Sequence, residues 1–361
     1  MAENVSSQND RSHYFHAEAH ALTGKLNLPF EEQIKKQAFV KLEGDSRKLL
    51  LEAKGDETGE APETRKLRRR MAQENYLSQR TKSFRLENVI SYSAAHTQVS
   101  GHRSVKHKDA FVTLSTSVVE NLNVLNVVTA DRVVGQISTT HFPDDYSPHV
   151  TFLGTHFENL RIAQHKVDPV LNLGFAGERP KGPKGYYPTR GTPLMTSVER
   201  QYQRLRGGLD EFKSHMEPEH VERLGAGDSW LSKQYHGLSG FDYGALQSCA
   251  QEAAEISAKA PNGNGGKWDG VTCSLVEHVE IEDIKIPERN GDTFVIPPPA
   301  RCLGRGHVIH VRDFGTIFLA ELTVNHNSFH LTMIRFELGC IADGSASLAS
   351  CSVNGKGSVG H

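Results

Sequence analysis

The sequence predicts a mainly β protein, an antiparallel β-sandwich that carries helical and disordered insertions. Three observations support this fold class. Runs rich in Val, Ile, Thr and Phe fill residues 83–174, and similar runs lie near both ends of the chain. Polar breaks rich in Gly and Pro separate these β-like regions from two segments of different character. The 37% of hydrophobic residues is enough for a packed core.

The N-terminal part contains two expected strands and a charged segment. Residues 14–28 alternate between apolar and polar positions, and residues 37–42 do so again. In residues 43–79 the periodicity disappears and charged residues, Gly and Pro take over. We therefore expect an exposed insertion over 43–79, with a short helix over 65–75.

The middle of the chain changes from strand-like to helical patterns. Residues 83–174 hold five β-like runs separated by Gly, Asn, Asp and Pro, which favours long antiparallel strands. After a break rich in Gly and Pro, residues 197–216 and 242–260 have the spacing of apolar residues that is typical of helices. These segments predict two helices inside a long insertion, residues 179–270.

The β character returns in the C-terminal part. Residues 271–286, 307–325 and 329–340 are again rich in β-branched and aromatic residues. The chain then closes with the segment GSASLASCSVNG and a glycine-rich tail. Because strands occupy both ends of the chain, we expect the two ends to share one sheet system.

These patterns predict one discontinuous β domain. It combines residues 13–178 with residues 271–354, and the helical insertion 179–270 interrupts it. Residues 1–12 and 355–361 lack periodic apolar patterns, so we expect a flexible N-terminus and a flexible tail.

Charge argues against a nucleic-acid partner. The formal net charge is -2 at pH 7, which gives no global attraction for a polyanion. One basic run exists, residues 65–70, but the acidic side chains of Glu57, Glu60 and Glu63 precede it. This composition favours a solvated, self-compensating insertion, and we expect no nucleic-acid partner.

The sequence also predicts a cytoplasmic location. The N-terminus has no basic segment followed by an apolar one, and no run of eighteen apolar residues occurs, so we expect neither export nor a membrane partner. The five cysteines are widely spaced, are odd in number and form no C-x-x-C pair, which fits reduced thiols.

Two pairs of segments resemble a known family. They read TLSTSVVENLNVLNVVTADRVVGQIST with VTFLGTHFENLRIAQHKV, and GTIFLAELTV with FHLTMIRFELGCIADGSASLASCSVNG. They resemble the choice-of-anchor P type β domains of bacterial surface proteins, over roughly a third of the chain. The resemblance implies an antiparallel sandwich of bacterial origin that serves a structural or interaction role, and it transfers no catalytic residue. Those proteins resemble secreted, anchored molecules, so their location is not carried over.

One histidine-containing motif suggests metal binding. In a strand, residues two apart face the same side, so His16, Glu18 and His20 would form one polar row. Two imidazoles spaced in this way can share a zinc ion, with the carboxylate as a ligand or as a hydrogen-bond partner of a ligand. The alternative is a solvated face of an edge strand, in which Ala17 and Ala19 fill the intervening positions.

No sequence motif assigns an enzymatic activity. A second group of histidines, His307, His310, His326 and His330, needs a turn before its members can converge. The chain contains no G-x-S-x-G, H-E-x-x-H or S-x-x-K motif, which weakens the hydrolase classes that these motifs mark.

Three functions remain after these observations. The leading prediction is a non-enzymatic structural or protein-interaction protein that associates with a protein partner or with itself, because strand edges are natural assembly surfaces. The first alternative is a metal-binding module or metal-dependent enzyme that uses zinc at His16, Glu18 and His20. The second alternative is a carbohydrate-binding or other ligand-binding β module that uses exposed aromatic residues. Those aromatic residues are Tyr186, Tyr187, Trp230 and Trp268. The interpretation that we favour for them is that they fold over the sheet as hydrophobic lids.

Overall fold

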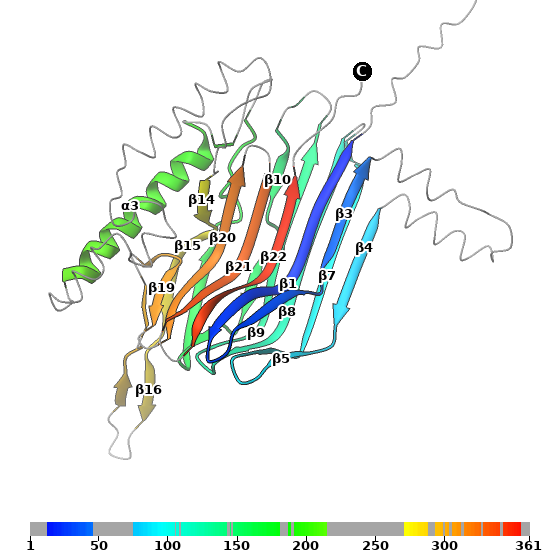
Figure 1. Cartoon of the computed structure of the whole chain (residues 1–361). Coiled ribbons are helices and arrows are strands. Elements are labelled where there is room, and N and C mark those ends of the chain that lie inside the picture. The colour runs from blue at the N-terminus through cyan, green and yellow to red at the C-terminus, as the bar shows by residue number, and fades with distance from the viewer. Residues whose placement is uncertain are drawn as a thin grey trace, which may run out of the picture.

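The protein folds into two antiparallel β-sheets that pack face to face, as the sequence predicts (Figure 1). The computed structural model describes residues 13–45, 75–104, 106–107, 110–142, 145, 147–180, 187–188, 191–214, 271–287, 293–298, 300–302, 305–311, 314–325, 328–339 and 342–354. Every strand pairing in this part of the chain is antiparallel, so the predicted mainly β sandwich is confirmed.

Sheet A unites the two ends of the chain. Its described strands follow one another in the order β18 (Ala300–Cys302), β19 (Val308–Val311), β20 (Gly315–Asn325), β21 (Ser328–Gly339), β22 (Asp343–Asn354), β1 (Tyr14–Leu28) and β2 (Glu32–Gln37). In addition, β14 (Val271–Ser274) pairs with β20, and β3 (Val40–Asp45) pairs with β1. The first and last described strands, β1 and β22, are direct neighbours in the centre of this sheet (Figure 1).

Sheet B is built from the middle of the chain. Its main path runs through β15 (Val276–Ile281), β13 (His165–Leu171), β12 (Arg161–Ile162), β9 (Val128–His141), β8 (Phe111–Val124), β6 (Ile90–Tyr92) and β5 (Phe84–Leu86). Beside this path, β10 (His149–Thr151) and β11 (His156–Glu158) pair with β9, β7 (Ala94–Arg103) pairs with β8, and β4 (Tyr76–Thr81) pairs with β7. The strand β4 therefore lies at an edge of the sheet.

Small side chains let the two sheets approach each other closely. The Ser115 hydroxyl of sheet B donates a hydrogen bond to the carbonyl oxygen of Glu18 in sheet A at 2.7 Å, and Ser117 donates to the carbonyl oxygen of His20 at 2.9 Å. In the opposite direction, the Cys351 thiol of sheet A donates to the carbonyl oxygen of Gly135 at 3.1 Å. Side chains of one sheet thus satisfy backbone acceptors of the other sheet. Longer side chains at these positions would hold the two sheets apart.

A left-handed residue changes the direction of the side chains along β22. Gly344, Ala346 and Leu348 are buried and each follows a more exposed residue, and beyond Ala349 the buried residues Cys351 and Val353 flank the half-buried Ser352. Ala349 has a φ of 48°, in the left-handed region. Because side chains of a regular strand alternate between faces, this residue is where the alternation shifts by one position.

One helix packs against the end of the sandwich. This helix, α3 (Pro193–Ser214), begins after Thr192, whose side-chain oxygen accepts a hydrogen bond from the Met195 backbone N–H at 3.3 Å. The Gln201 side chain donates to the Ser274 carbonyl oxygen at 3.0 Å and accepts from the Ser274 backbone N–H at 2.8 Å. Buried apolar side chains along α3, such as Val198, complete the attachment.

Several sequence expectations need correction or lie outside the described residues. The alternation over 14–28 is confirmed by β1, but β2 and β22 were not expected as separate strands. The insertion expected over 43–79 is too wide, because β3 extends to Asp45 and β4 begins at Tyr76. The helices expected over 65–75 and 242–260, and the flexible ends 1–12 and 355–361, lie outside the described residues. The division into a discontinuous β domain and an inserted segment stays a prediction.

The described part of the chain contains no helix that is long and apolar enough to cross a membrane. Its only described cysteines, Cys273, Cys302 and Cys351, carry free thiols.

Candidate functional site

The polar row expected on β1 lies on the outer face of sheet A. Phe15, Ala17 and Ala19 are buried between the sheets, so the alternating residues His16, Glu18 and His20 face outward. His16 lies opposite Glu43 of β3, and the Glu18 carboxylate forms an ion pair with Lys36 of β2.

His20 differs from the solvated residue that the alternative interpretation requires. Only 5% of its surface is exposed, and burial, reinforced by the nearby Lys36 charge, lowers its pKa to about 4. Its Nδ1 lies 3.9 Å from the Glu18 carboxylate, and its buried Nε2 has no hydrogen-bond partner among the described residues.

The metal hypothesis is not decided by this geometry. Within the residues described, no group of three or more His, Cys, Asp or Glu side chains is arranged to hold a metal ion. Glu18 would have to leave Lys36 to serve as a zinc ligand. The zinc site at His16, Glu18 and His20 stays a prediction.

Sheet pairing brings a histidine of the second group into this row. His330 lies opposite Ser352 of β22, and Ser352 lies opposite Glu18 of β1. Burial lowers the pKa of His330 as well, with Glu18 and Lys36 among the charges that act on it. No local sequence pattern joins His330 to Glu18, because the two are neighbours only through the order of the strands. His326 lies outside the described residues.

The aromatic residues expected on the surface are not supported as a ligand site. Tyr187 is fully buried, packs edge-on against Phe329 and donates from its hydroxyl to the carbonyl oxygen of Pro148 at 2.9 Å. Tyr187 therefore lies in the interior, as expected for an aromatic residue that folds over the sheet, and not on an exposed ligand-binding surface. Tyr186, Trp230 and Trp268 lie outside the described residues.

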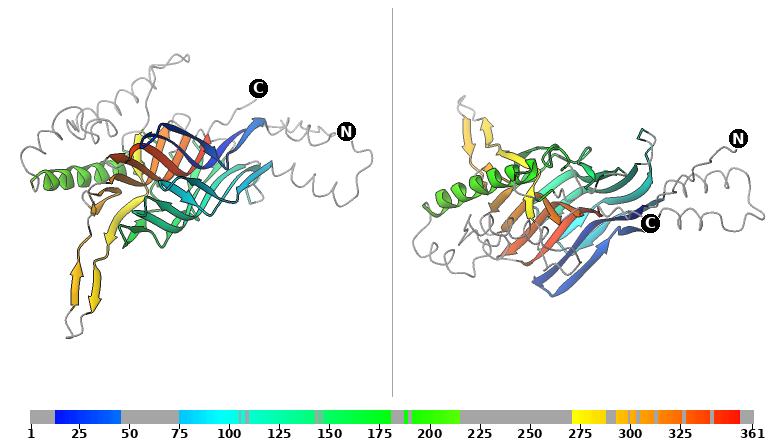
Figure 2. Two further views of the ribbon diagram at one scale, coloured as in Figure 1. Left: turned by 60° about the horizontal axis from the view of Figure 1, so that its bottom comes forward. Right: turned by 90° about the horizontal axis from the view of Figure 1, so that it is seen from above.

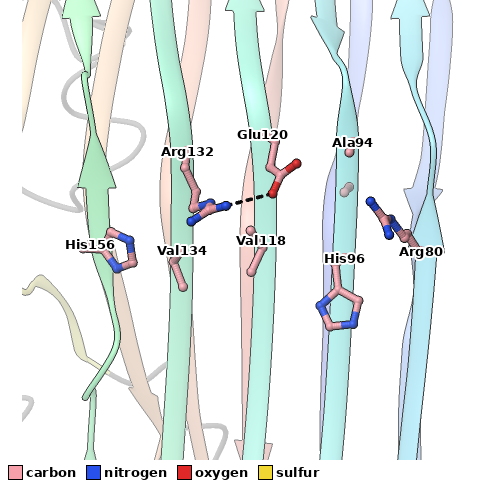
Figure 3. A pocket seen from close by; sticks show the side chains of 9 residues that line it. Arg80, Ala94, His96, Val118, Glu120, Arg132, Val134 and His156 are labelled. Carbon is pink, nitrogen blue, oxygen red and sulfur yellow. Dashed lines mark hydrogen bonds and ion pairs between the residues drawn. The ribbon is translucent and has the colours of Figure 1, made fainter.

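A shallow groove crosses the outer face of sheet B (Figure 3). It has a volume of about 380 Å³, and strands β4, β7, β8, β9 and β11 supply its walls and floor. Its lining residues are Arg80, Ala94, Ala95, His96, Val118, Glu120, Arg132, Val134 and His156. Strand pairing places five of them directly opposite one another, in the row Arg80, His96, Val118, Val134 and His156.

The charges of the groove are unevenly paired. The Arg132 guanidinium lies 3.1 Å from the Glu120 carboxylate and 3.6 Å from the Glu158 carboxylate. His156 Nε2 also lies 3.1 Å from Glu158. Arg80, at the other end, forms no ion pair with a described residue. No sequence pattern indicates this groove, because five different strands each supply only one to three of its residues.

A second candidate surface is an apolar hairpin that projects from the sandwich (Figures 1 and 2). Its strands β16 (Ile284–Pro287) and β17 (Thr293–Ile296) pair only with each other among the described strands. One face of this hairpin carries four apolar side chains, Ile284, Ile286, Phe294 and Ile296. Ile286 and Phe294 are 45% and 56% exposed. Such a face is unusual on a surface that contacts water alone.

Comparison with known proteins assigns the chain to a family. Residues 74–325 match the family model described as a domain of unknown function, DUF8256. The chain belongs to this family. A search of curated proteins and a search of solved structures both find no match. The DUF8256 match begins just before β4 and ends with β20, so it includes the groove and the hairpin but neither β1 nor β22. The resemblance to choice-of-anchor P type domains stays an expectation.

Proposed function

We propose that this protein is a non-enzymatic, self-associating β protein that uses the β16–β17 hairpin as a docking arm. The observation that carries the proposal is the exposed apolar face of Ile284, Ile286, Phe294 and Ile296 on an element that projects away from the body (Figure 2).

Leaving this hairpin uncovered in water is unfavourable in free energy. A two-stranded hairpin is only marginally stable by itself, and half-exposed Ile and Phe side chains gain free energy when a partner covers them. The opposite face of the arm carries two polar residues, Lys285 and Thr293, beside Val295 and Pro287, so the face with Ile286 and Phe294 is the more apolar of the two. Arms from two copies can cover each other around a two-fold axis, because such an interface joins the same surface patch of both subunits.

The test is the molar mass in solution across a range of protein concentrations, measured by light scattering after size exclusion. We expect the wild-type protein to form a defined oligomer and the double variant Ile286→Ser with Phe294→Ser to be monomeric. Lys285→Ser, on the opposite face of the same hairpin, is the matched control and should remain oligomeric. A monomeric wild-type protein, or an oligomeric double variant, would contradict the proposal.

Zinc binding is the second candidate function, because the buried Nε2 of His20 has no partner among the described residues. A neutral imidazole of this kind is a suitable zinc ligand. Elemental analysis of untagged protein should then find one zinc ion per chain, and the variant His20→Gln should lose it. Metal-free wild-type protein that has been purified without chelators and supplied with zinc would exclude this role.

The cytoplasmic location is part of the same proposal. The three free thiols of the described cysteines support it, because extracellular proteins usually pair such residues.

A further inference from the structure

The groove on sheet B provides a binding surface separate from the docking arm. We propose that it binds an extended peptide segment of a partner protein, in which a carboxylate is followed by apolar side chains. This inference does not depend on self-association through the hairpin, because the groove and the hairpin share no residue.

Arg80 supplies the carboxylate-binding end of the groove. Its guanidinium extends over the strand that carries Ala94 and His96 (Figure 3). Whereas Arg132 is held between two carboxylates, Arg80 has no carboxylate partner in the described part of the chain. A guanidinium can form two parallel hydrogen bonds with one carboxylate, which makes an arginine in this position selective for that group.

Ala94 creates the space for the ligand beside Arg80. Glu158, Arg132, Glu120 and Ala94 lie directly opposite one another on four neighbouring strands, and their charges alternate until the series reaches Ala94. The small methyl group leaves a hollow between the Glu120 carboxylate and the Arg80 guanidinium (Figure 3). Because the Arg132 guanidinium already pairs with the Glu120 carboxylate, a ligand carboxylate can enter at this position beside Arg80 without displacing an existing ion pair.

The floor of the groove favours apolar side chains next to the carboxylate. Val118 and Val134 lie side by side in the centre, and the imidazoles of His96 and His156 flank them. Val118 is half-buried and Val134 is only 8% exposed, so a ligand side chain in the groove gains mainly by covering Val118.

The shape of the groove favours a polypeptide over a small molecule. One face of one sheet supplies all of the lining residues, so the groove contacts a ligand from one side only. Small-molecule sites usually enclose most of their ligand. The row from Arg80 to His156 crosses four strand spacings, which is about 19 Å. An extended peptide of about six residues covers that length.

The test uses fluorescein-labelled hexapeptides whose ends are blocked, with the sequence Asp-Val-Ser-Val-Ser-Val and the same sequence beginning with Asn or Lys. Binding to the full chain is measured by fluorescence anisotropy at low and at moderate salt. We expect the Asp peptide to bind about fivefold more tightly than the Asn peptide, the size of one partly exposed ion pair. The Lys peptide should bind more weakly than either.

Three variants locate the binding site. Arg80→Gln should remove the preference for Asp over Asn, and Val134→Asp should abolish binding of the Asp peptide. Arg161→Gln, which changes an exposed arginine of sheet B outside the groove, is the matched control and should bind like the wild type. Unchanged unfolding curves confirm that each variant is folded.

Several results would overturn the proposal. These are a wild-type protein that binds none of the peptides, an Arg80→Gln variant that keeps the Asp preference, or complete competition by millimolar acetate, which would indicate a small-anion site. Because the arm variants Ile286→Ser and Phe294→Ser leave the groove intact, they should bind the Asp peptide normally. Failure of the peptide assay is therefore distinguishable from failure of the self-association proposal.

Discussion

Arg335 and Glu321 lie on neighbouring strands of sheet A, and the Arg335 guanidinium donates two hydrogen bonds to the Glu321 carboxylate, from Nε to Oε2 at 2.5 Å and from Nη2 to Oε1 at 2.8 Å. Its third contact, from Nη1 to Glu337, is also 2.8 Å long. The Phe318 ring centroid lies 3.7 Å from the guanidinium carbon. The arginine thus neutralises two carboxylates on a face where the Glu321 side chain is only 7% exposed.

Removing this arginine should strongly destabilise the protein. The variant Arg335→Met leaves the Glu321 and Glu337 carboxylates without their shared cation, which should lower the free energy of unfolding by about 3–5 kcal/mol. Urea denaturation at pH 7 measures the change. The control variant Glu120→Gln removes the exposed ion pair between Glu120 and Arg132. It should lower the free energy of unfolding by less than about 1 kcal/mol. Equal losses of unfolding free energy in the two variants would contradict the expectation that the Arg335 ion pairs stabilise the protein more than an exposed ion pair does.

Gly135 should not tolerate a side chain. A Cβ atom at this position would lie 2.7 Å from the Ala349 carbonyl oxygen and 2.9 Å from Cγ of Met333, both in the opposite sheet. Gly135→Ala should therefore force the sheets apart and reduce the free energy of unfolding by about 1–3 kcal/mol.

A glycine in the helix provides the opposite expectation. A Cβ atom at Gly207 of α3 meets no atom within 4 Å. Gly207→Ala should raise the free energy of unfolding by about 0.5–1 kcal/mol, because alanine restricts the unfolded chain and favours the helix. Thermal unfolding of both glycine variants beside the wild type tests the pair. A neutral Gly135→Ala would contradict the close approach of the sheets.

Stability should fall as the pH drops below about 6.5. Burial lowers the pKa of His141 to about 3 and that of His307 to about 4, whereas an unfolded histidine has a pKa near 6.5. Between these values protons bind to the unfolded chain and not to the folded protein, so acid favours unfolding. Above pH 6.5 both states are neutral and this contribution to stability is fully present. Each histidine then accounts for about 1.4 kcal/mol per pH unit in the sensitive range.

The variant His141→Phe tests this origin of acid sensitivity. His141 lies beside the ring of His13, with the two ring centroids 4.6 Å apart, in an interior where another aromatic ring can be accommodated. Urea denaturation between pH 5 and pH 7 should show a shallower loss of stability in the variant, by up to about 1.4 kcal/mol per pH unit. An unchanged slope would mean that His141 is not the group that titrates.

The segment that matches DUF8256 should not fold by itself. Residues 74–325 lack β1, β21 and β22, which cover the inner face of β8 and β9. Buried side chains such as Val119 and Ile137 would then face water. We expect this fragment to aggregate or to unfold without cooperativity, whereas residues 13–354 should show one sharp thermal transition. Circular dichroism with thermal melting compares the two polypeptides.

Local patterns predicted the strands with alternating or strongly β-forming sequences. The strand β1 follows its predicted bounds because Phe15, Ala17 and Ala19 alternate with polar residues. The strand β22 was missed because Ser, Ala and Gly have little intrinsic preference for strands. It forms a strand because β1 and β21 pair with it on its two sides. Its small side chains fit the narrow space against sheet B.

The candidate sites were less predictable than the strands. The alternation of side chains along a strand correctly placed His16, Glu18 and His20 on one face. It could not show that His20 is buried or that His330 is a neighbour. The groove depends on the pairing of five strands, from Arg80 to His156, and no local pattern encodes that pairing. Of the hairpin, only β16 overlaps an expected β segment, residues 271–286, and β17 was not expected. The isolation of the hairpin from both sheets is a tertiary property that no local pattern shows.

The pairing of β1 with β22 also has a consequence for biosynthesis. A ribosome releases residues 14–28 long before residues 343–354, the strand that flanks them in sheet A. The sandwich therefore cannot close before β22 has been made, and β1 must wait for all of the chain between the two strands. Until then the nascent chain has an apolar surface that requires protection, so newly made protein should depend on chaperones more than its finished stability suggests.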